Sequence, residues 1–455
     1  MTDSATPPIR FDTPAGLALE AAFDGGRLTS DGGLPWLAEV DGELGLCAAL
    51  AARVPEWRRG AVAHPLEALV RQRVLQIACG YEDQDDADGL RSDPLLKLAC
   101  GRLPETGGDL ASQPTMSRLE NAPGLRDCYR MALALGEVYV RERGRLAPGG
   151  APERILLDLD GTDDPAYGGQ EGTAYHGYYR QRMYHPLLVF DGDTGQLVTV
   201  VLRPGSSHAS RGAVAVLRRI VRWLRREWPG VEIEIRADGG FAAPAVYEYC
   251  EAAGVGYTVG LVPNARLEAL AAPLAERAVS ESEAAGGEKV RLGSEAAYGA
   301  GSWGRERRVV YKAEAQRVEK RRGAETLANT RFVVTSRADE PQALYDWYVG
   351  RGGAEGWVKD YKRALKADRL SCHRFRANQF RLLLHAAAYC LLDALRRRLA
   401  AAGLERMQLD TLRLRLVKVA GRVRQLATRV HLHLASSHPG QDLWRTLAAE
   451  RGSAP

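Results

Sequence analysis

Cysteine is scarce in this chain, and the cysteines that occur do not pair along the sequence. The 455 residues contain seven of them, at positions 47, 79, 100, 128, 250, 372 and 390. No two follow each other with the C-x2-C spacing of a zinc knuckle, and the dispersed pattern does not suggest a disulfide framework. We therefore expect a protein of a reducing compartment, and the cytoplasm is the simplest choice.

Long apolar runs are also missing. No stretch approaches the roughly 18 consecutive apolar residues of a membrane span, and the polar, proline-containing start has no apolar signal core. Internal repeats and long low-complexity tracts are absent too. Because 45% of the residues are apolar, there is ample material for buried cores, and we expect a soluble globular protein of several domains without membrane attachment.

Charge is distributed unevenly. The net charge is only +5, but residues 351–434 contain 19 Lys and Arg against 6 Asp and Glu, a net of +13, which leaves −8 for the remainder. Basic side chains neutralise phosphates and release counterions, so a basic C-terminal third is typical of a protein that binds a polyanion. A solvated helical surface in an arginine-rich protein is the alternative.

Hydrophobic periodicity predicts an α/β protein. Residues 1–25 indicate an N-terminal arm, and residues 30–145 have the three-to-four spacing of helices. After Gly149-Gly150 the pattern changes to apolar runs, which we interpret as strands. The predicted order is strands at 155–159, 186–190 and 196–202, a helix at 213–228, a strand at 231–235, a helix at 245–253 and a strand at 257–262. This order matches a ribonuclease-H-like sheet with a hairpin at one side.

The remaining sequence predicts an insertion and a helical tail. Residues 265–329 interrupt the pattern with Ala, Glu, Gly and Arg, and we interpret them as an inserted β-rich subdomain. The predicted domains are 1–150, an N-terminal arm and helical DNA-binding domain; 151–264 and 330–370, the two parts of a ribonuclease-H-like core; 265–329, the insertion; and 371–455, a basic helical C-terminal region.

Two aspartates stand where a predicted strand meets a glycine turn. Asp160 follows the apolar run that also contains Asp158, and Asp238 follows the strand that ends before Gly239-Gly240. Asp158 and Asp160 alternate with leucines, so both would point to one face of the sheet. An aspartate before a glycine is often only a turn residue, because its side chain caps the local backbone.

A third carboxylate lies within the pattern Tyr348, Arg351, Glu355, Lys362. At about 100° per residue these four residues fall within an arc of roughly 60° on a helix, so they can face one phosphate backbone. The glycines at 350, 352 and 353 each disfavour a helix by about 1 kcal/mol relative to alanine. Either the helix bends there or its backbone approaches a ligand closely. Three carboxylates from separate elements suit a divalent metal site and phosphoryl transfer.

These motifs together resemble one family. The chain is similar to insertion-sequence DDE transposases of the superfamily marked by the Tyr-Arg-Glu-Lys signature, of the DDE domain group 1 type, and the resemblance covers nearly the whole chain. Besides the signature, the matching stretches are 112–115, 118–121, 158–162, 167–172, 184–188, 202–205 and 236–241. Gly239 stands where such sequences often have serine.

The resemblance implies that Asp160, Asp238 and Glu355 form the catalytic triad. Oxygen-only ligands favour Mg²⁺, with Mn²⁺ able to substitute, and two ions about 3.5–4 Å apart would assist the attacking and leaving oxygens. The implied activity is metal-dependent DNA nicking and strand transfer in cut-and-paste transposition. The implied partners are double-stranded DNA, as terminal inverted repeats of the element and as target, and a second copy of the chain in a synaptic homodimer. Such a protein would be bacterial, cytoplasmic and nucleoid-associated when bound to DNA.

We expect further residues to contact DNA. Arg351, Lys359 and Lys362 would reach phosphates, Tyr348 would contact the backbone or pack under the helix, and surface pairing with Glu355 is the alternative for the cations. Outside the signature, we predict that Arg118 contacts DNA from the N-terminal helices and that Trp303 stacks on an unpaired base. Packing in the core is the alternative for the tryptophan.

Two other readings remain open. One is a catalytically inactive DNA-binding protein derived from a transposase, which acts as a repressor or structural protein. The other is a stand-alone ribonuclease-H-like nuclease without strand transfer.

Overall fold

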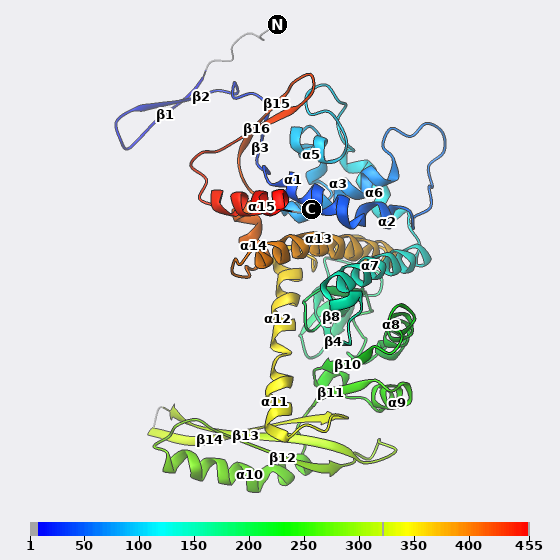
Figure 1. Cartoon of the computed structure of the whole chain (residues 1–455), viewed down its shortest axis with the longest axis vertical. Coiled ribbons are helices and arrows are strands. Elements are labelled where there is room, and N and C mark those ends of the chain that lie inside the picture. Colours follow the sequence, from blue (N-terminus) through cyan, green and yellow to red (C-terminus); the bar gives the residue numbers. More distant parts are fainter. Residues whose placement is uncertain (1–7, 321–322, 454–455) are drawn as a thin grey trace. The chain divides into compact units, whose positions relative to one another are not determined.

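The computed structural model describes residues 8–320 and 323–453 and divides into two compact units (Figure 1). Unit 1 comprises residues 1–48, 56–119 and 391–455, and unit 2 comprises residues 49–55 and 120–390. In the described part of the chain, no helix has the length and apolarity needed to cross a bilayer.

The N-terminal part of unit 1 is mainly helical, as predicted. An isolated antiparallel hairpin, β1 and β2, precedes the helices, and its large apolar side chains are exposed. The elements are β1 Ile9–Asp12, β2 Ala18–Ala21, β3 Leu28–Thr29, α1 Leu34–Leu44, α2 Leu46–Ala51, α3 Leu66–Cys79, α4 Asp86–Leu90, α5 Pro94–Ala99 and α6 Gln113–Asn121; the last residues of α2 and α6 belong to unit 2.

The C-terminal part of unit 1 contains a β-hairpin, which was not part of the predicted basic helical region 371–455. The strands β15 (Gly421–Gln425) and β16 (Val430–Leu434) pair, and β15 also pairs with β3, in the order β16-β15-β3. Arginines and histidines alternate with apolar residues in both strands, and this period of two is the spacing of a strand. The other elements are α13 Phe375–Ala401, which begins in unit 2, α14 Leu409–Leu412, a π-helical turn Arg413–Val417 and α15 Gln441–Ser453.

Unit 2 is built on a mixed eight-stranded sheet in the order β12-β13-β14-β11-β10-β4-β8-β9. Strand β10 runs parallel to both β4 and β11, and all other neighbours are antiparallel. The central elements agree with the predicted order. They are β4 Arg154–Gly161, β8 Leu187–Asp191, β9 Leu197–Val201, α8 Ala213–Glu227, β10 Glu232–Ala237, α9 Pro244–Ala253 and β11 Gly256–Leu261.

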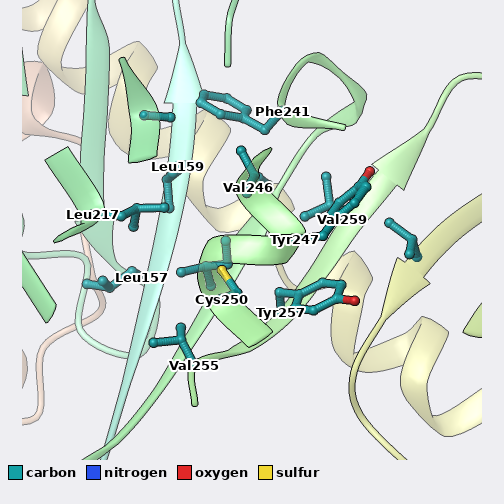
Figure 2. Close-up of a cluster of buried hydrophobic side chains, with 14 of the residues drawn as sticks. Leu157, Leu159, Leu217, Phe241, Val246, Tyr247, Cys250, Val255, Tyr257 and Val259 are labelled. Atoms are coloured by element: carbon teal, nitrogen blue, oxygen red, sulfur yellow. The ribbon is translucent and has the colours of Figure 1, made fainter. Parts of the chain in front are cut away.

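The core of unit 2 lies between this sheet and the helices α8 and α9. Figure 2 shows Leu157 and Leu159 of β4 together with Leu217 of α8 and with Tyr247 and Cys250 of α9, and all five are fully buried. Because side chains alternate along a strand, Asp158, which lies between these two leucines, and Asp160, which follows them, point to the opposite face. The sheet therefore has an apolar face under the two helices and a second face on which carboxylates stand.

The insertion differs from the predicted β-rich subdomain in two ways. It begins with a 20-residue helix, α10 (Ala265–Ala284), which packs along the strands that follow. Its strands β12 (Val290–Tyr298), β13 (Arg307–Lys320) and β14 (Gly323–Thr335) extend the central sheet, because β14 pairs with β11. The predicted boundary at residue 330 therefore falls inside one continuous strand.

The remaining elements of unit 2 flank the sheet. Helices α11 (Pro341–Val349) and α12 (Gly352–Lys359) follow each other in nearly the same direction (Figure 1), and a π-helical turn, Asp360–Ala364, continues α12. A small sheet in the order β5-β7-β6 stands between β4 and β8 in the sequence. Its strands are β5 Asp164–Pro165, β6 Ala174–His176 and β7 Gln181–Tyr184; the other elements are α7 Leu125–Leu146 and the short 3₁₀ turns Pro148–Gly150 and Gly239–Phe241.

Candidate active site

The register of two parallel strands brings Asp160 and Asp238 side by side. Leu159 of β4 is paired with Ala237 of β10, so the next residue on each strand is one of the two aspartates. Ligand sites in α/β sheets lie at the carboxyl ends of parallel strands, which is where both stand. Asp238 also caps its own turn, since its Oδ1 accepts a 2.9 Å hydrogen bond from the amide of Gly240.

A buried ion pair lies one step deeper on the same two strands. Asp158 is paired in register with Arg236, and both Oδ atoms of Asp158 accept 2.7 Å hydrogen bonds from the Arg236 guanidinium. The third arginine nitrogen donates to the carbonyl of Trp347 on α11 at 2.9 Å. Asp158 is thus engaged in a structural pair that ties β4, β10 and α11 together.

The helix pair α11 and α12 is interrupted where the sequence has glycine. Glu340 caps α11 by accepting from two backbone amides, and Pro341 is its first residue, as expected at a helix start. At Gly350 an added Cβ would come within 2.9 Å of the Arg236 Nη1, so a side chain there would displace the guanidinium that binds Asp158. The four signature residues therefore do not share one regular helix: Tyr348 lies on α11, Arg351 at the junction, Glu355 on α12 and Lys362 in the π turn.

Arg351 lies between two of the three acidic residues. Its Nη1 is 3.6 Å from Asp160 Oδ2, and its Nη2 is 3.6 Å from Glu355 Oε1. Its side chain is 15% exposed and that of Asp160 14%, whereas that of Glu355 is 71% exposed. The buried Nη1 makes no hydrogen bond within the described residues, so these ion pairs are loose compared with the Asp158–Arg236 pair.

The environment of Asp160 disfavours its negative charge. Burial raises the pKa of Asp160 to about 7, with further contributions from the Asp238 and Glu355 carboxylates and an opposing one from the Arg351 guanidinium. Burial is the main cause of the raised pKa of Asp160, and the neighbouring carboxylates of Asp238 and Glu355 add to it. Additional positive charge at this point would stabilise them.

The donor set fits a divalent cation in its chemistry, but the ligands are not pre-assembled. Three carboxylates offer only oxygen atoms, which Mg²⁺ and Mn²⁺ prefer, and burial disfavours the negative charge of Asp160. Across residues 8–320 and 323–453, no three His, Cys, Asp or Glu side chains are arranged to hold a metal ion. Asp160, Asp238 and Glu355 therefore have the chemistry that such an ion prefers but do not form a coordination site in their present arrangement.

Tyr348 and Lys362 both have internal partners. The hydroxyl of Tyr348 donates to the carbonyl of Ala237 at 3.0 Å, next to Asp238, so the ring packs under the helix. Lys362 Nζ lies 2.7 Å from Asp163 Oδ1, just beyond β4. Lys359 is exposed on α12.

The two predicted DNA contacts outside the signature lie in different surroundings. Arg118 is exposed on α6 and donates to Thr115 Oγ1 at 3.2 Å. Trp303 is partly buried, with its ring 5.3 Å from that of Tyr247 and under the guanidinium of Arg307. The structure thus shows Trp303 packed against the core cluster, which was the alternative for this residue.

Sequence reasoning missed the β6–β7 hairpin beside Asp160. His185, at the end of β7, lies so close to Gly161 that a Cβ on this glycine would be 2.8 Å from the His185 Nε2. Rings of His176 and Tyr179 pack on His185 at 5.2 and 5.9 Å. The available signal was a concentration of tyrosine and arginine between residues 174 and 184.

The chain matches one family model and resembles a solved structure. The model of a family described as transposase DDE domain group 1 matches residues 11–451. No curated protein matches the sequence. Among solved structures, a piggyBac transposase synaptic complex with hairpin DNA resembles the chain with a TM-score of 0.43 and 12% identity, over 86% of this chain and 80% of that chain.

Proposed function

The chain belongs to the transposase DDE domain group 1 family, and from this premise we propose that it binds the terminal inverted repeats of an insertion sequence and moves the element by metal-dependent DNA cleavage and strand transfer. The observation that carries the proposal is the pairing of β4 with β10, which brings Asp160 beside Asp238 with Arg351 and Glu355 close by. We further propose that the core is ribonuclease-H-like.

In the proposed mechanism Asp160, Asp238 and Glu355 would hold the ions. Divalent cations, when bound, supply the positive charge that a phosphodiester needs at its attacking and leaving oxygens. Asp160 and Asp238 would offer carboxylate oxygens from the ends of β4 and β10, and Glu355, the most exposed of the three, would offer its own from α12.

Arg351 and Lys362, the two cations of the signature, would contact the DNA backbone. Arg351 neutralises Asp160 and Glu355 in the free protein, and it would exchange these partners for a phosphate beside the scissile bond. Lys362 is oriented by Asp163 toward the same edge of the sheet. Tyr348, whose hydroxyl is occupied by Ala237, would act as a positioning residue for the strand that ends at Asp238.

The C-terminal hairpin offers a surface for recognition of the element end. The register pairs Arg422 with His433 and Arg424 with His431, so the four side chains share one face of the β15–β16 ribbon. Both arginines are exposed. Exposed cations in a row suit the phosphates of duplex DNA, since phosphate contacts fix the position of a protein on the helix. We propose that two chains each hold one end in this way, as a homodimer.

The test is cleavage of a labelled duplex that carries the inverted repeat found in the DNA flanking the gene. With Mg²⁺ we expect nicking at the element end, and with Ca²⁺ binding without nicking. Glu355→Gln keeps the shape but removes a charge from the site, and it should lower the rate about 10²–10³-fold or more. Glu276→Gln, an exposed acid on α10, serves as the matched control and should retain full activity.

Other results would change the conclusion. Specific binding with no nicking by either protein would favour the catalytically inactive derivative. Nicking that is equally fast in Glu355→Gln would remove this residue from the site, and nicking without joining to a second DNA would favour a stand-alone nuclease.

A further inference from the structure

The β6–β7 hairpin is rich in aromatic and basic residues and contains no acidic one. Between residues 174 and 184 it has four tyrosines, two arginines and one histidine. The strands pair Ala174 with Met183 and His176 with Gln181, which leaves residues 177–180 as the turn. Aromatic rings interleaved with cations are the composition of surfaces that bind single-stranded nucleic acid.

The base of this hairpin stands against the catalytic end of β4. His185 closes on Gly161, which directly follows Asp160, and the Tyr179 ring packs on His185 with a centroid distance of 5.9 Å. Burial raises the pKa of Tyr179 to about 12, and the carboxylates of Asp163, Asp160 and Asp238 add to the effect. Tyr179 is therefore connected through His185 to Gly161, the residue that follows Asp160.

The hairpin is anchored to the signature as well. Gln181 Nε2 donates to Asp163 Oδ2 at 2.9 Å, and Lys362 Nζ lies 2.7 Å from the other oxygen of the same carboxylate. On β7, Arg182 Nε donates to Thr173 Oγ1 at 2.9 Å. A platform held by such contacts keeps its orientation, which precise recognition requires.

The turn presents an exposed ring. Tyr178 is 85% exposed, and its ring meets Tyr179 edge to face at a centroid distance of 5.0 Å. Arg180, beside it, has a left-handed φ of +55°, a backbone conformation that residues other than glycine rarely adopt. One face of the Tyr178 ring is thus exposed to solvent, next to the exposed guanidinium of Arg180. The β6–β7 hairpin that carries both residues lies against the end of β4.

We propose that Tyr178 is a stacking platform for an unpaired DNA base next to the scissile phosphate, with Arg180 neutralising the adjoining backbone. The inference rests on the proposed function, because it needs DNA at the carboxylates. A base is favoured over an acidic peptide because the π-face of the ring is the feature exposed, and every base can stack on it regardless of sequence. The hairpin thereby takes the stacking role that the sequence suggested for Trp303.

Binding of two DNA probes by the full chain tests this inference. One probe is a fully paired 30-base-pair duplex, and the other is the same duplex with four unpaired nucleotides at one end and 2-aminopurine at the junction. In Ca²⁺, without cleavage, we expect the wild type to prefer the forked probe and to quench the 2-aminopurine fluorescence. Tyr178→Ala should lose about 5- to 150-fold in affinity for the forked probe only, the range that base stacking contributes.

Three variants separate stacking from other effects. Tyr178→Phe and Tyr178→Trp retain an aromatic face and should preserve both the preference and the quenching. Tyr129→Ala removes a tyrosine that is 47% exposed on α7, outside the hairpin, and should leave both unchanged. Because Tyr178 makes little buried contact, Tyr178→Ala should fold, and its thermal melt checks this.

The outcomes distinguish a failure of the proposed function from a failure of the stacking role of Tyr178. If the wild type binds neither probe, the proposed function fails, and the hairpin inference fails with it. If it binds both but Tyr178→Ala changes nothing, the DNA-binding function survives and the stacking role is overturned. An equal loss on both probes would also overturn it, since the residue would then contact only the duplex backbone.

Discussion

Two aspartates on one strand, separated by a single leucine, have opposite environments. Asp158 is fully buried and bound at both oxygens by Arg236 at 2.7 Å. Asp160 lies at the edge, 3.6 Å from Arg351, and shares its surroundings with two more carboxylates. The deeper pair is closed by two short hydrogen bonds, whereas Asp160 and Glu355 share one guanidinium at 3.6 Å. The comparison indicates that the first pair holds the strands in register and that the second is left incomplete for a ligand.

The contrast between the two aspartates is tested most strongly by replacement of Arg236, the arginine that binds the buried Asp158. Arg236→Met leaves the charge of Asp158 buried without a partner, which should lower the free energy of unfolding by about 3–5 kcal/mol. Urea unfolding followed by circular dichroism measures the loss. The double variant Asp158→Leu with Arg236→Met should recover most of it, because no charge then remains buried. A loss below about 1 kcal/mol in the single variant would show that the pair does not support the sheet.

Replacement of the outer aspartate should have the opposite effect on stability. The folded protein holds the Asp160 proton more tightly than the unfolded chain does, because the pKa of Asp160 is raised to about 7. The stability due to this proton is present below the unfolded pKa and is lost as the pH rises through about 7. Asp160→Asn should therefore be more stable than wild type at pH 8 in EDTA, by on the order of a few kcal/mol, and nearly equal at pH 4.

Thermal melts at pH 4, 6 and 8 test this expectation. Asp346→Asn, which alters an exposed residue of α11, is the control for loss of a carboxylate elsewhere in unit 2. Addition of Mg²⁺ at pH 8 should stabilise the wild type more than Asp160→Asn. A difference between the two proteins that does not change with pH would contradict the shared charge of the three acids.

Arg351 should compete with metal ions for the carboxylates of Asp160 and Glu355. Arg351→Gln removes a positive charge that lies 3.6 Å from both Asp160 and Glu355, so Mn²⁺ should bind the DNA-free protein about tenfold more tightly. Electron paramagnetic resonance of free Mn²⁺ gives the affinity directly. Arg363→Gln, which removes an exposed cation of the π turn, should change it little. Unchanged or weaker binding in Arg351→Gln would mean that the arginine does not act as an internal counterion.

The smallest effect is expected at Tyr348. Tyr348→Phe removes the hydrogen bond to the Ala237 carbonyl and should lower the free energy of unfolding by about 1 kcal/mol. DNA affinity should stay the same, because the hydroxyl is already occupied. Filter binding together with urea unfolding separates the two effects, with Tyr167→Phe as a control at a ring that is 55% exposed. A loss of DNA affinity without a loss of stability would indicate that the Tyr348 hydroxyl does contact DNA.

Local patterns predicted the centre of the fold better than its periphery. The strands β4 and β10 and the helix α8 were predicted within one or two residues, because their apolar spacing is regular and glycines bound them. Helix α10 was missed although Leu267, Ala271, Leu274 and Ala278 recur at helical spacing, since alanine and Pro273 obscure the pattern. In β15 and β16 arginine or histidine alternates with apolar residues, which is the period of a strand. The basic composition of this region was interpreted as helical, and the alternation was overlooked.

The candidate site was predictable in its members but not in its contacts. Asp160, Asp238 and Glu355 stand in recognisable motifs, and their neighbourhood follows from strand register. The partners of Asp158, Tyr348 and Lys362 depend on which residues face each other across the sheet, and one sequence does not contain that information. The tyrosine hairpin lay between two stretches that matched the family, and none of its residues suggested a metal ligand or catalytic group.

The π turn at Asp360–Ala364 has a consequence for how the signature tolerates insertions and deletions. A π turn holds one residue more than an α turn, so the six-residue gap between Glu355 and Lys362 does not encode a helical phase. Deletion of one residue there would convert the π turn into an α turn, which leaves the residues beyond it nearly in phase. Insertion of one residue would instead rotate Lys362 by about 100° about the helix axis, away from Asp163. A one-residue deletion in this gap is therefore expected to be tolerated better than a one-residue insertion.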